Sequence, residues 1–159
     1  MKATQKEIDK ALSLLTETPL RIVDVTQGIE EVVLHTKQDK QPWSVNDILA
    51  HLRSCADLWT HSLYAMLAEN EPVFSDINER KWAKVARYAE VSFHESFRAF
   101  SSQRENLLRV LKHLPFKSWE RPAIIFERKH TVFTQTRRMA KHEQEHCGQI
   151  EGLLLKNRE

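Results

Sequence analysis

The sequence predicts an all-α fold, an antiparallel four-helix bundle with short extra helices. Its 159 residues include only three glycines and five prolines, too few for a turn-rich β fold. Apolar residues recur at helical spacing over long stretches, and no segment alternates apolar and polar residues as a half-buried strand would. Long helices joined by intermediate loops favour antiparallel packing. We expect a single domain over residues 1–159, because no linker, repeat or low-complexity segment divides the chain.

Two helical segments are expected near the N-terminus. The first covers about residues 4–16, and its apolar face is formed by Ile8, Ala11, Leu12 and Leu15. Thr18 and Pro19 have the pattern of an N-cap followed by proline at the first helical position. A second segment would therefore run from there to about Thr26, where Gly28 breaks it.

The clearest helix start lies at Ser44. This residue is the expected N-cap, Asp47 completes a pattern close to a capping box, and Trp43 is a candidate hydrophobic staple. The helix would run to about Glu69, before Pro72. Its apolar positions are Val45, Ile48, Leu52, Cys55, Trp59, Leu63 and Met66.

Short helices are expected over residues 29–34 and 78–87, the second carrying Trp82. Ser92 caps a third long helix, and Pro115 stops it. The apolar seam of this helix consists of Phe93, Phe97, Phe100, Leu107, Leu111 and Leu114.

The last long helix is expected to begin after its cap, Thr131, and to run to about Asn157. Residues 118–129 before it are expected to be irregular. The sequence therefore predicts four main helices and no strand, as expected for a helical bundle.

Composition and charge exclude several function classes. The net charge is +2 and the charges are interleaved in sign, which argues against a nucleic-acid partner. The first residues lack the apolar core of a signal peptide, and no apolar run reaches ~18 residues, so no membrane association is expected. Cys55 and Cys147 are expected to be buried thiols of a cytoplasmic protein.

Two histidines four residues apart, His142 and His146, can face one metal ion from a single helix. At ~100° per residue, the apolar residues of that helix centre near Glu143, with His146 about 60° and His142 about 100° away on one side. On the Ser44 helix, His51 lies about 80° from an apolar centre near Trp59. All three histidines thus border the core, where a catalytic zinc or nickel ion could stay open to substrate.

Other interpretations of these histidines remain open. Scattered histidines usually face solvent or bond to a neighbour, as we expect for His35, His61, His94, His113 and His130. Cys55 lies one turn after His51 and could complete a closed structural zinc site, or it could be a small buried hydrophobe. The string from His142 to His146 also matches the H-E-x-x-H pattern of zinc proteases, but Gly152 stands where a third histidine ligand would be expected.

Glu143 points where an apolar residue is expected, so its carboxylate needs a partner. One interpretation is a buried ion pair with Arg104, which interrupts the apolar seam of the third long helix. The other is a carboxylate that acts as a general base or orients a ligand beside the metal.

Three segments together resemble the DinB-like superfamily, metal-binding four-helix bundles that include bacillithiol- and mycothiol-dependent S-transferases. Residues 43–52 match W-S-x-x-x-[IL]-x-x-H-[IL], and residues 142–150 match H-x-x-x-H-x-G-Q-[IL]. Residues 119–121, Trp-Glu-Arg, match the region before the last helix, and the Thr18–Pro19 pair also fits.

The resemblance implies that His51, His142 and His146 hold one divalent ion, nickel or zinc, with water completing the shell. It also implies an up-down-down-up helix order and a homodimer. Gly148 would allow a close helix contact, and Gln149 would support the site by hydrogen bonding.

We therefore expect a metal-dependent enzyme whose nucleophile is a metal-activated thiol or water. Its substrate would be a small molecule, and its reaction a thiol transfer or a related hydrolysis. Glu143 would be the catalytic base, with Trp59 and Trp82 as walls of the substrate pocket. The alternative is a non-catalytic helical module that binds a small molecule or partner and keeps a structural or vestigial metal site.

Overall fold

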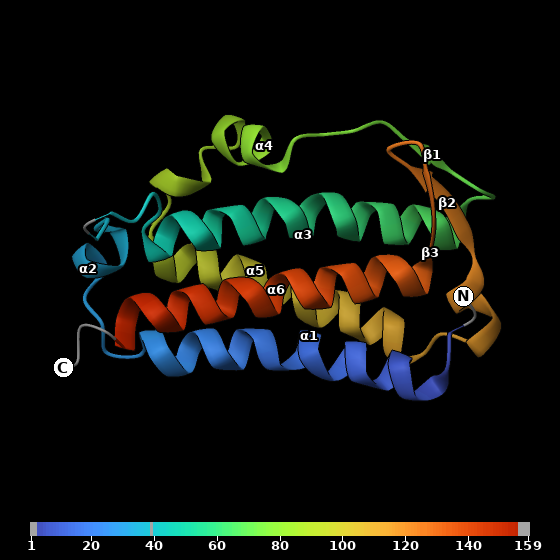
Figure 1. The fold of residues 1–159 in the computed structure, drawn as a ribbon, viewed down its shortest axis with the longest axis horizontal. Coiled ribbons are helices and arrows are strands. Elements are labelled where there is room, and N and C mark those ends of the chain that lie inside the picture. The colour runs from blue at the N-terminus through green and yellow to red at the C-terminus, as the bar shows by residue number, and fades with distance from the viewer. Residues whose placement is uncertain (1–2, 39, 156–159) are drawn as a thin grey trace.

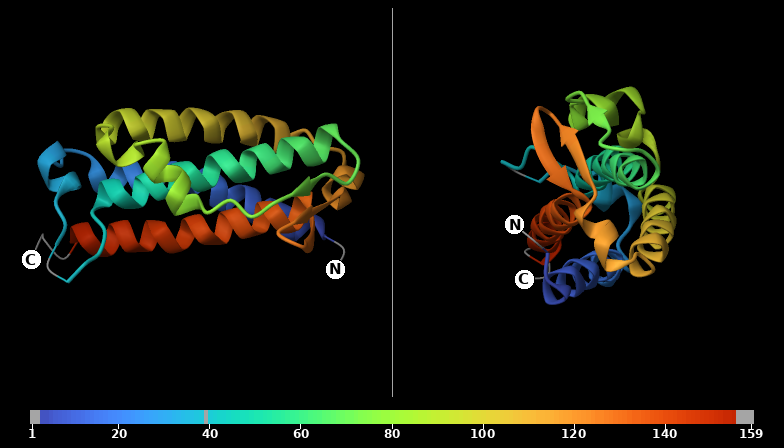
Figure 2. Two further views of the ribbon diagram at one scale, coloured as in Figure 1. Left: turned by 90° about the horizontal axis from the view of Figure 1, so that it is seen from above. Right: turned by 90° about the vertical axis from the view of Figure 1, so that its right-hand side faces the viewer.

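Four long helices form the body of the computed structural model, which describes residues 3–38 and 40–155. They are α1 (Gln5–Thr26), α3 (Val45–Ala68), α5 (Phe93–Lys112) and α6 (Val132–Leu155). Helices α1 and α6 run in one direction and α3 and α5 in the other, which is the up-down-down-up order (Figure 1). The end-on view in Figure 2 shows the four packed around a common axis. The predicted bundle is confirmed.

The starts of the long helices follow the predicted capping residues. Ser44 forms a capping box with Asp47, in which each side chain accepts a hydrogen bond from the other residue's backbone N–H. Ser92 accepts from the N–H of Glu95, and Thr131 accepts from the N–H of Thr134. The expected end of α6 near 157 falls outside the described residues.

Helix α1 is continuous, so the expected break at Thr18–Pro19 is wrong. Pro19 lies inside the helix, where it removes one backbone bond at a cost of about 3 kcal/mol. The buried side chains of Leu15 and Ile22 lie on either side of the proline, so packing against the core spans the site of the lost bond. In the turn before Pro19, the side chains of Thr18 and Gln144 both donate hydrogen bonds to the carbonyl oxygen of Leu14.

The segment expected to be irregular, residues 118–129, instead contains short strands, although the fold as a whole is the predicted helical bundle. Strands β2 (Pro122–Ile125) and β3 (Arg128–Thr131) form a hairpin, and β1 (Val73–Phe74) pairs with β2 in parallel. A short 3₁₀ helix, η2 (Phe116–Glu120), precedes them. Periodicity could not reveal strands of two to four residues.

The connection from α3 to α5 runs back along the whole bundle (Figure 1). It contains β1, then α4 (Glu79–Val85) and a 3₁₀ turn, η1 (Tyr88–Glu90). The remaining short helix, α2 (Glu31–His35), lies between α1 and α3. Both α4 and α2 agree with the predicted short helices to within a few residues.

Asp57 of α3 anchors this returning segment to the bundle. Its carboxylate accepts from Tyr88 Oη at 2.5 Å, from Trp82 Nε1 at 3.3 Å and from Gln103 Nε2 at 3.0 Å. One side chain therefore joins α3 to α4, η1 and α5. The position of α4, which borders the site described below, depends on this acceptor.

The core fills the space between the long helices in two adjoining clusters. The larger residues at its centre include Leu15, Leu63, Phe100, Phe133 and Ile150, all almost completely buried. Among the described residues no helix combines the length and hydropathy needed to cross a bilayer.

We predict that Asp57→Ala lowers the free energy of unfolding by about 1–3 kcal/mol, because three donors lose their acceptor. Urea unfolding measures this change, and hydrogen exchange should show faster opening of α4 amides. Asp24→Ala, an exposed aspartate on α1, is the matched control. Equal effects of the two variants would contradict the anchoring role.

Candidate metal centre

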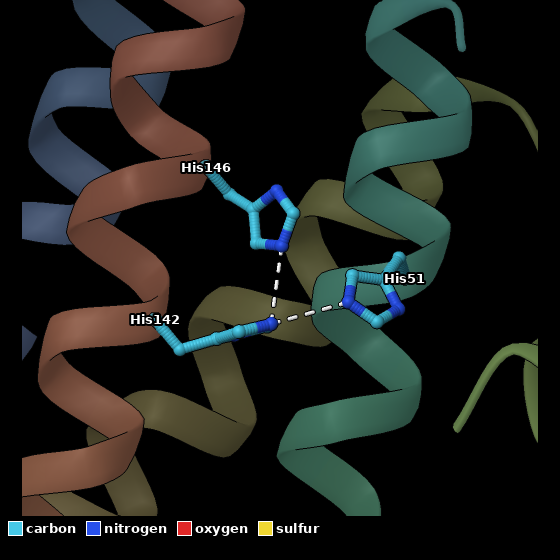
Figure 3. Close-up of side chains that lie close together, drawn as sticks. All are labelled: His51, His142 and His146. Atoms are coloured by element: carbon cyan, nitrogen blue, oxygen red, sulfur yellow. Dashed lines mark hydrogen bonds between the residues drawn. The ribbon is translucent and has the colours of Figure 1, made fainter. Parts of the chain in front are cut away.

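Two helices position the three histidines that the sequence singled out. His51 lies two turns after the Ser44 cap of α3, and His142 and His146 lie one turn apart on α6. Because α3 and α6 pack against each other, the three side chains meet between them (Figure 3). The structure thus brings together the three residues that the sequence predicted.

The Nε2 atoms of the three rings converge on His142. The distance from His142 Nε2 to His51 Nε2 is 3.2 Å, and that to His146 Nε2 is 3.1 Å. One potential ligand atom from each ring lies within 4.8 Å of the others. Nitrogens bound to one ion at ~2.0–2.1 Å in tetrahedral geometry lie about 3.3 Å apart. The two distances from His142 Nε2 therefore fit ligands of one shared divalent ion.

The rings are held in the neutral state that a metal ligand requires. Burial, with the neighbouring His146 and the cation of Arg80, lowers the pKa of His51 to about 4. Burial, together with the other two imidazoles, lowers the pKa of His142 to about 3. The pKa of His146 is also lowered, mainly by burial. Metal binding at neutral pH would displace no protons from these rings.

Gln149, which the resemblance implies as a supporting residue, lies next to the His146 ring. Its Oε1 lies 2.8 Å from His146 Nδ1, so this nitrogen carries the proton and Nε2 keeps its lone pair. His142 Nδ1 is buried and has no hydrogen-bond partner among the described residues. The two α6 histidines therefore differ in support: one is oriented by an amide, the other by ring packing.

Aromatic rings enclose the histidines on two sides. Trp59, predicted as a pocket wall, contacts the His142 ring edge-on at 4.9 Å between centroids and lines a cavity beside it. Trp43 lies 5.2 Å from the His51 ring and 6.1 Å from the His146 ring. The sequence suggested Trp43 only as a helix staple, so its place in the site was missed.

Trp82 does not line either cavity beside the histidines, which corrects the prediction that it forms a pocket wall. Trp82 is 40% exposed, and its Nε1 donates to Asp57. The segment that carries it does border the site, through Arg80, which lies two residues before Trp82 on α4. Nothing in the helical pattern distinguished Arg80 from other exposed cations.

Two cavities are each lined by both His51 and His142. The first, about 510 Å³, is lined by Trp43, Ile48, Gln149 and Leu153 and by the three histidines. The second, about 730 Å³, is lined by His51, Cys55, Trp59, His130 and His142 and by a group of charged side chains. Both volumes are in the range of small-molecule sites. His130, expected to be structural or exposed, therefore lies at the second cavity.

Glu143 lies in the core, where its carboxylate contacts the guanidinium of Arg104. Both side chains are almost fully buried. Burial raises the pKa of Glu143, whereas the Arg104 cation acts in the opposite direction. Glu143 does not line the two cavities. These contacts favour the ion-pair interpretation over a base that reaches a substrate.

Cys55 and Cys147 are both buried free thiols. Cys55 Sγ lies 3.6 Å from His51 Nε2 and 3.8 Å from His51 Nδ1. Burial raises the pKa of the Cys55 thiol, which disfavours the thiolate that a metal ligand requires. A four-ligand set including Cys55 therefore has less support than the three histidines alone.

Comparisons with known proteins support this description. A family model described as the DinB superfamily matches residues 5–150. A Halalkalibacterium halodurans protein named "Putative metal-dependent hydrolase" is 24% identical over 110 residues, which cover 69% of this chain. The match spans 64% of that relative's own length.

A solved structure also resembles the chain. This structure is that of YfiT from Bacillus subtilis, described as "a probable metal-dependent hydrolase with an unusual four-helix bundle topology". The TM-score is 0.81 at 17% identity, and the match covers 95% of this chain and 87% of that one. At this identity the likeness establishes the fold.

We predict that Glu143→Leu lowers the free energy of unfolding by about 3–5 kcal/mol, because it leaves the Arg104 cation buried and unpaired. The double variant Arg104→Leu/Glu143→Leu should recover most of this loss, since no charge then remains in the core. Chemical denaturation measures both effects. A double variant as unstable as the single one would contradict the ion-pair role.

We also predict that the metal-free protein loses stability as the pH falls from about 6.5 toward 4. The pKa values of His51 and His142 are lower in the folded state, about 4 and 3, than the ordinary 6.5. The unfolded chain therefore binds protons first, and stability rises with pH through this window.

Urea unfolding at several pH values gives the slope of the unfolding free energy against pH. His51→Asn/His142→Asn should flatten it relative to the wild type, whereas His113→Asn, an exposed histidine after α5, should leave it unchanged. A slope that the double variant does not alter would show that other groups cause it.

Proposed function

Because the chain belongs to the DinB superfamily, whose model matches residues 5–150, we propose that it is a metal-dependent enzyme acting on a small molecule. His51, His142 and His146 would hold one divalent ion. The observation that carries the proposal is the convergence of three neutral imidazole nitrogens beside two cavities of ligand size.

The donor set favours zinc or nickel. Neutral imidazole is a ligand of intermediate softness that suits both ions, whereas magnesium and calcium prefer oxygen. Three protein ligands also leave coordination positions for a reactant, as catalytic sites do and closed structural sites do not. When bound, such an ion supplies a Lewis acid that lowers the pKa of a water or thiol.

The chain's own residues would orient the reactants. Gln149 fixes the His146 ring by holding its Nδ1 proton. Trp59 and Trp43 pack against the histidine rings and keep part of the surrounding surface away from water. Such packing limits rotation of the imidazoles, so the three nitrogens stay aimed at one point.

Two cavities on either side of the histidines favour a reaction between two small molecules. His51 and His142 line both cavities, so reactants held in each would meet at the proposed ion. A thiol transfer requires two such reactants, whereas hydrolysis requires one reactant and water. We therefore propose thiol transfer to an electrophile as the reaction. Hydrolysis, the activity in the names of the two similar proteins, is the second candidate.

The non-catalytic alternative rests on Cys55, the one thiol next to the histidines in the described residues. If Cys55 bound the ion, the site would have four protein ligands and no position for a reactant. The same geometry would then serve to stabilise the α3–α6 contact. The coordination number of the bound ion therefore separates an enzyme from a structural metal site.

We predict that the metal-free protein binds one Zn²⁺ or Ni²⁺ per chain in a calorimetric titration. Gln149→Ala should weaken binding about 10–100-fold, as loss of a supporting hydrogen bond does, and His51→Ala should weaken it more. His113→Ala is the control that should bind normally. Absence of a bound ion, or equal affinity of His51→Ala, would refute the proposal.

Two further readouts complete this experiment. Transfer of a small thiol to chlorodinitrobenzene, followed by absorbance, should require the ion and His51. With Co²⁺ in the site, thiolate charge-transfer bands that disappear in Cys55→Ser would establish the structural alternative instead.

A further inference from the structure

The second cavity beside the histidines is lined by an excess of cations. Four of its side chains are positively charged and two, Glu79 and Glu145, are negatively charged, which leaves a net charge of +2 with neutral histidines. The cations are Arg80, Arg137, Arg138 and Lys141. The first cavity has a single charged side chain, Arg80. The charge is therefore concentrated on one side of the site.

These four cations form no salt bridge within the described residues. Across residues 3–38 and 40–155, none of the four has a carboxylate oxygen within 4.0 Å. Other arginines do pair in this way: Arg21 with Glu151, and Arg87 with Glu90. Arginine stays protonated at any ordinary pH, so the cavity keeps its positive potential.

Aromatic rings hold three of the guanidinium groups in place. Arg138 lies over the ring of Trp59 at 4.7 Å, and Arg80 over the ring of Trp43 at 5.1 Å. Arg137 lies 5.2 Å from the centre of the Phe133 ring. Stacked guanidinium groups lose less freedom on binding an anion than free side chains do. The cations are therefore arranged in advance of a ligand.

We propose that this cavity binds the anionic group, a carboxylate or a phosphate, of one substrate. The inference rests on the proposed function, because His51 and His142 line the same cavity and would present the ion to the rest of that substrate. Arg138 and Lys141 lie one turn apart on α6, so both can reach one anion. Guanidinium groups bind both oxyanions through paired N–H donors.

The test measures binding of three probes to the protein loaded with Zn²⁺: succinate, its neutral diamide succinamide, and inorganic phosphate. Succinate or phosphate should bind in isothermal titration, and succinamide at least tenfold more weakly. Arg138→Gln and Lys141→Gln should each weaken anion binding about 10–100-fold, the usual effect of losing a hydrogen bond to a charged group. Preference for phosphate over succinate, or the reverse, would assign the group within the proposed class.

Two control variants come from the exposed surface of α5. Arg98→Gln and Lys112→Gln remove the same charges from residues that do not line either cavity, and they should leave anion binding unchanged. Arg138 and Lys141 are exposed, so their variants should unfold at the wild-type temperature. Equal binding of succinamide and succinate, or equal loss in the α5 variants, would overturn the proposal.

Metal content measured on the same samples separates this inference from the proposed function. If the protein binds no ion but anion binding still depends on Arg138 and Lys141, the metal-dependent function fails and the anion site stands. If the ion binds but no anion depends on these residues, the function stands and the inference fails. The titrations with protein free of metal also show whether an anion binds through the ion alone.

Discussion

The buried contact between Arg104 of α5 and Glu143 of α6 determines how α6 is turned in the bundle. A carboxylate in the core is stable only beside its partner. Rotation of α6 about its axis would separate the two groups and leave both charges unpaired. With Glu143 facing the axis, His142 and His146 necessarily lie on one side of it, toward α3. His51 comes from that neighbouring helix. The ion pair thus fixes the direction in which the two α6 histidines point.

The order of the helices explains how the second wall of the site is built. Since α3 and α5 run in the same direction, the chain must return along the full length of the bundle between them (Figure 1). A direct turn could not make this connection. The return path carries α4 across the outside of the bundle and brings Arg80 to both cavities. Asp57 holds this path against α3, so a residue outside the site determines where Arg80 lies.

The sequence predicted the parts of the fold that depend on local chemistry. Capping residues and apolar spacing located the long helices, and the averaged apolar directions placed three histidines beside the core. What local patterns could not reveal was the effect of distant contacts. Pro19 predicted a helix break. The helix continues because buried side chains on both sides of the proline pack against other helices, and a local pattern does not reveal such packing. The short strands and the contacts of Trp82 and Arg80 depend on the path of a long connection, which no periodicity describes.

The position of the histidines at the border of the core reconciles two opposing requirements. Deep burial would keep the imidazoles neutral but would exclude a reactant, whereas full exposure would leave their pKa values near 6.5 and their rings mobile. Half-burial between α3 and α6 lowers the pKa of His51 to about 4 and that of His142 to about 3, and it leaves both rings on the walls of two cavities. Arg80 also lowers the pKa of His51, and Arg138 that of His142. The cations that make one cavity attractive to an anion therefore also help to keep the neighbouring nitrogens free of protons.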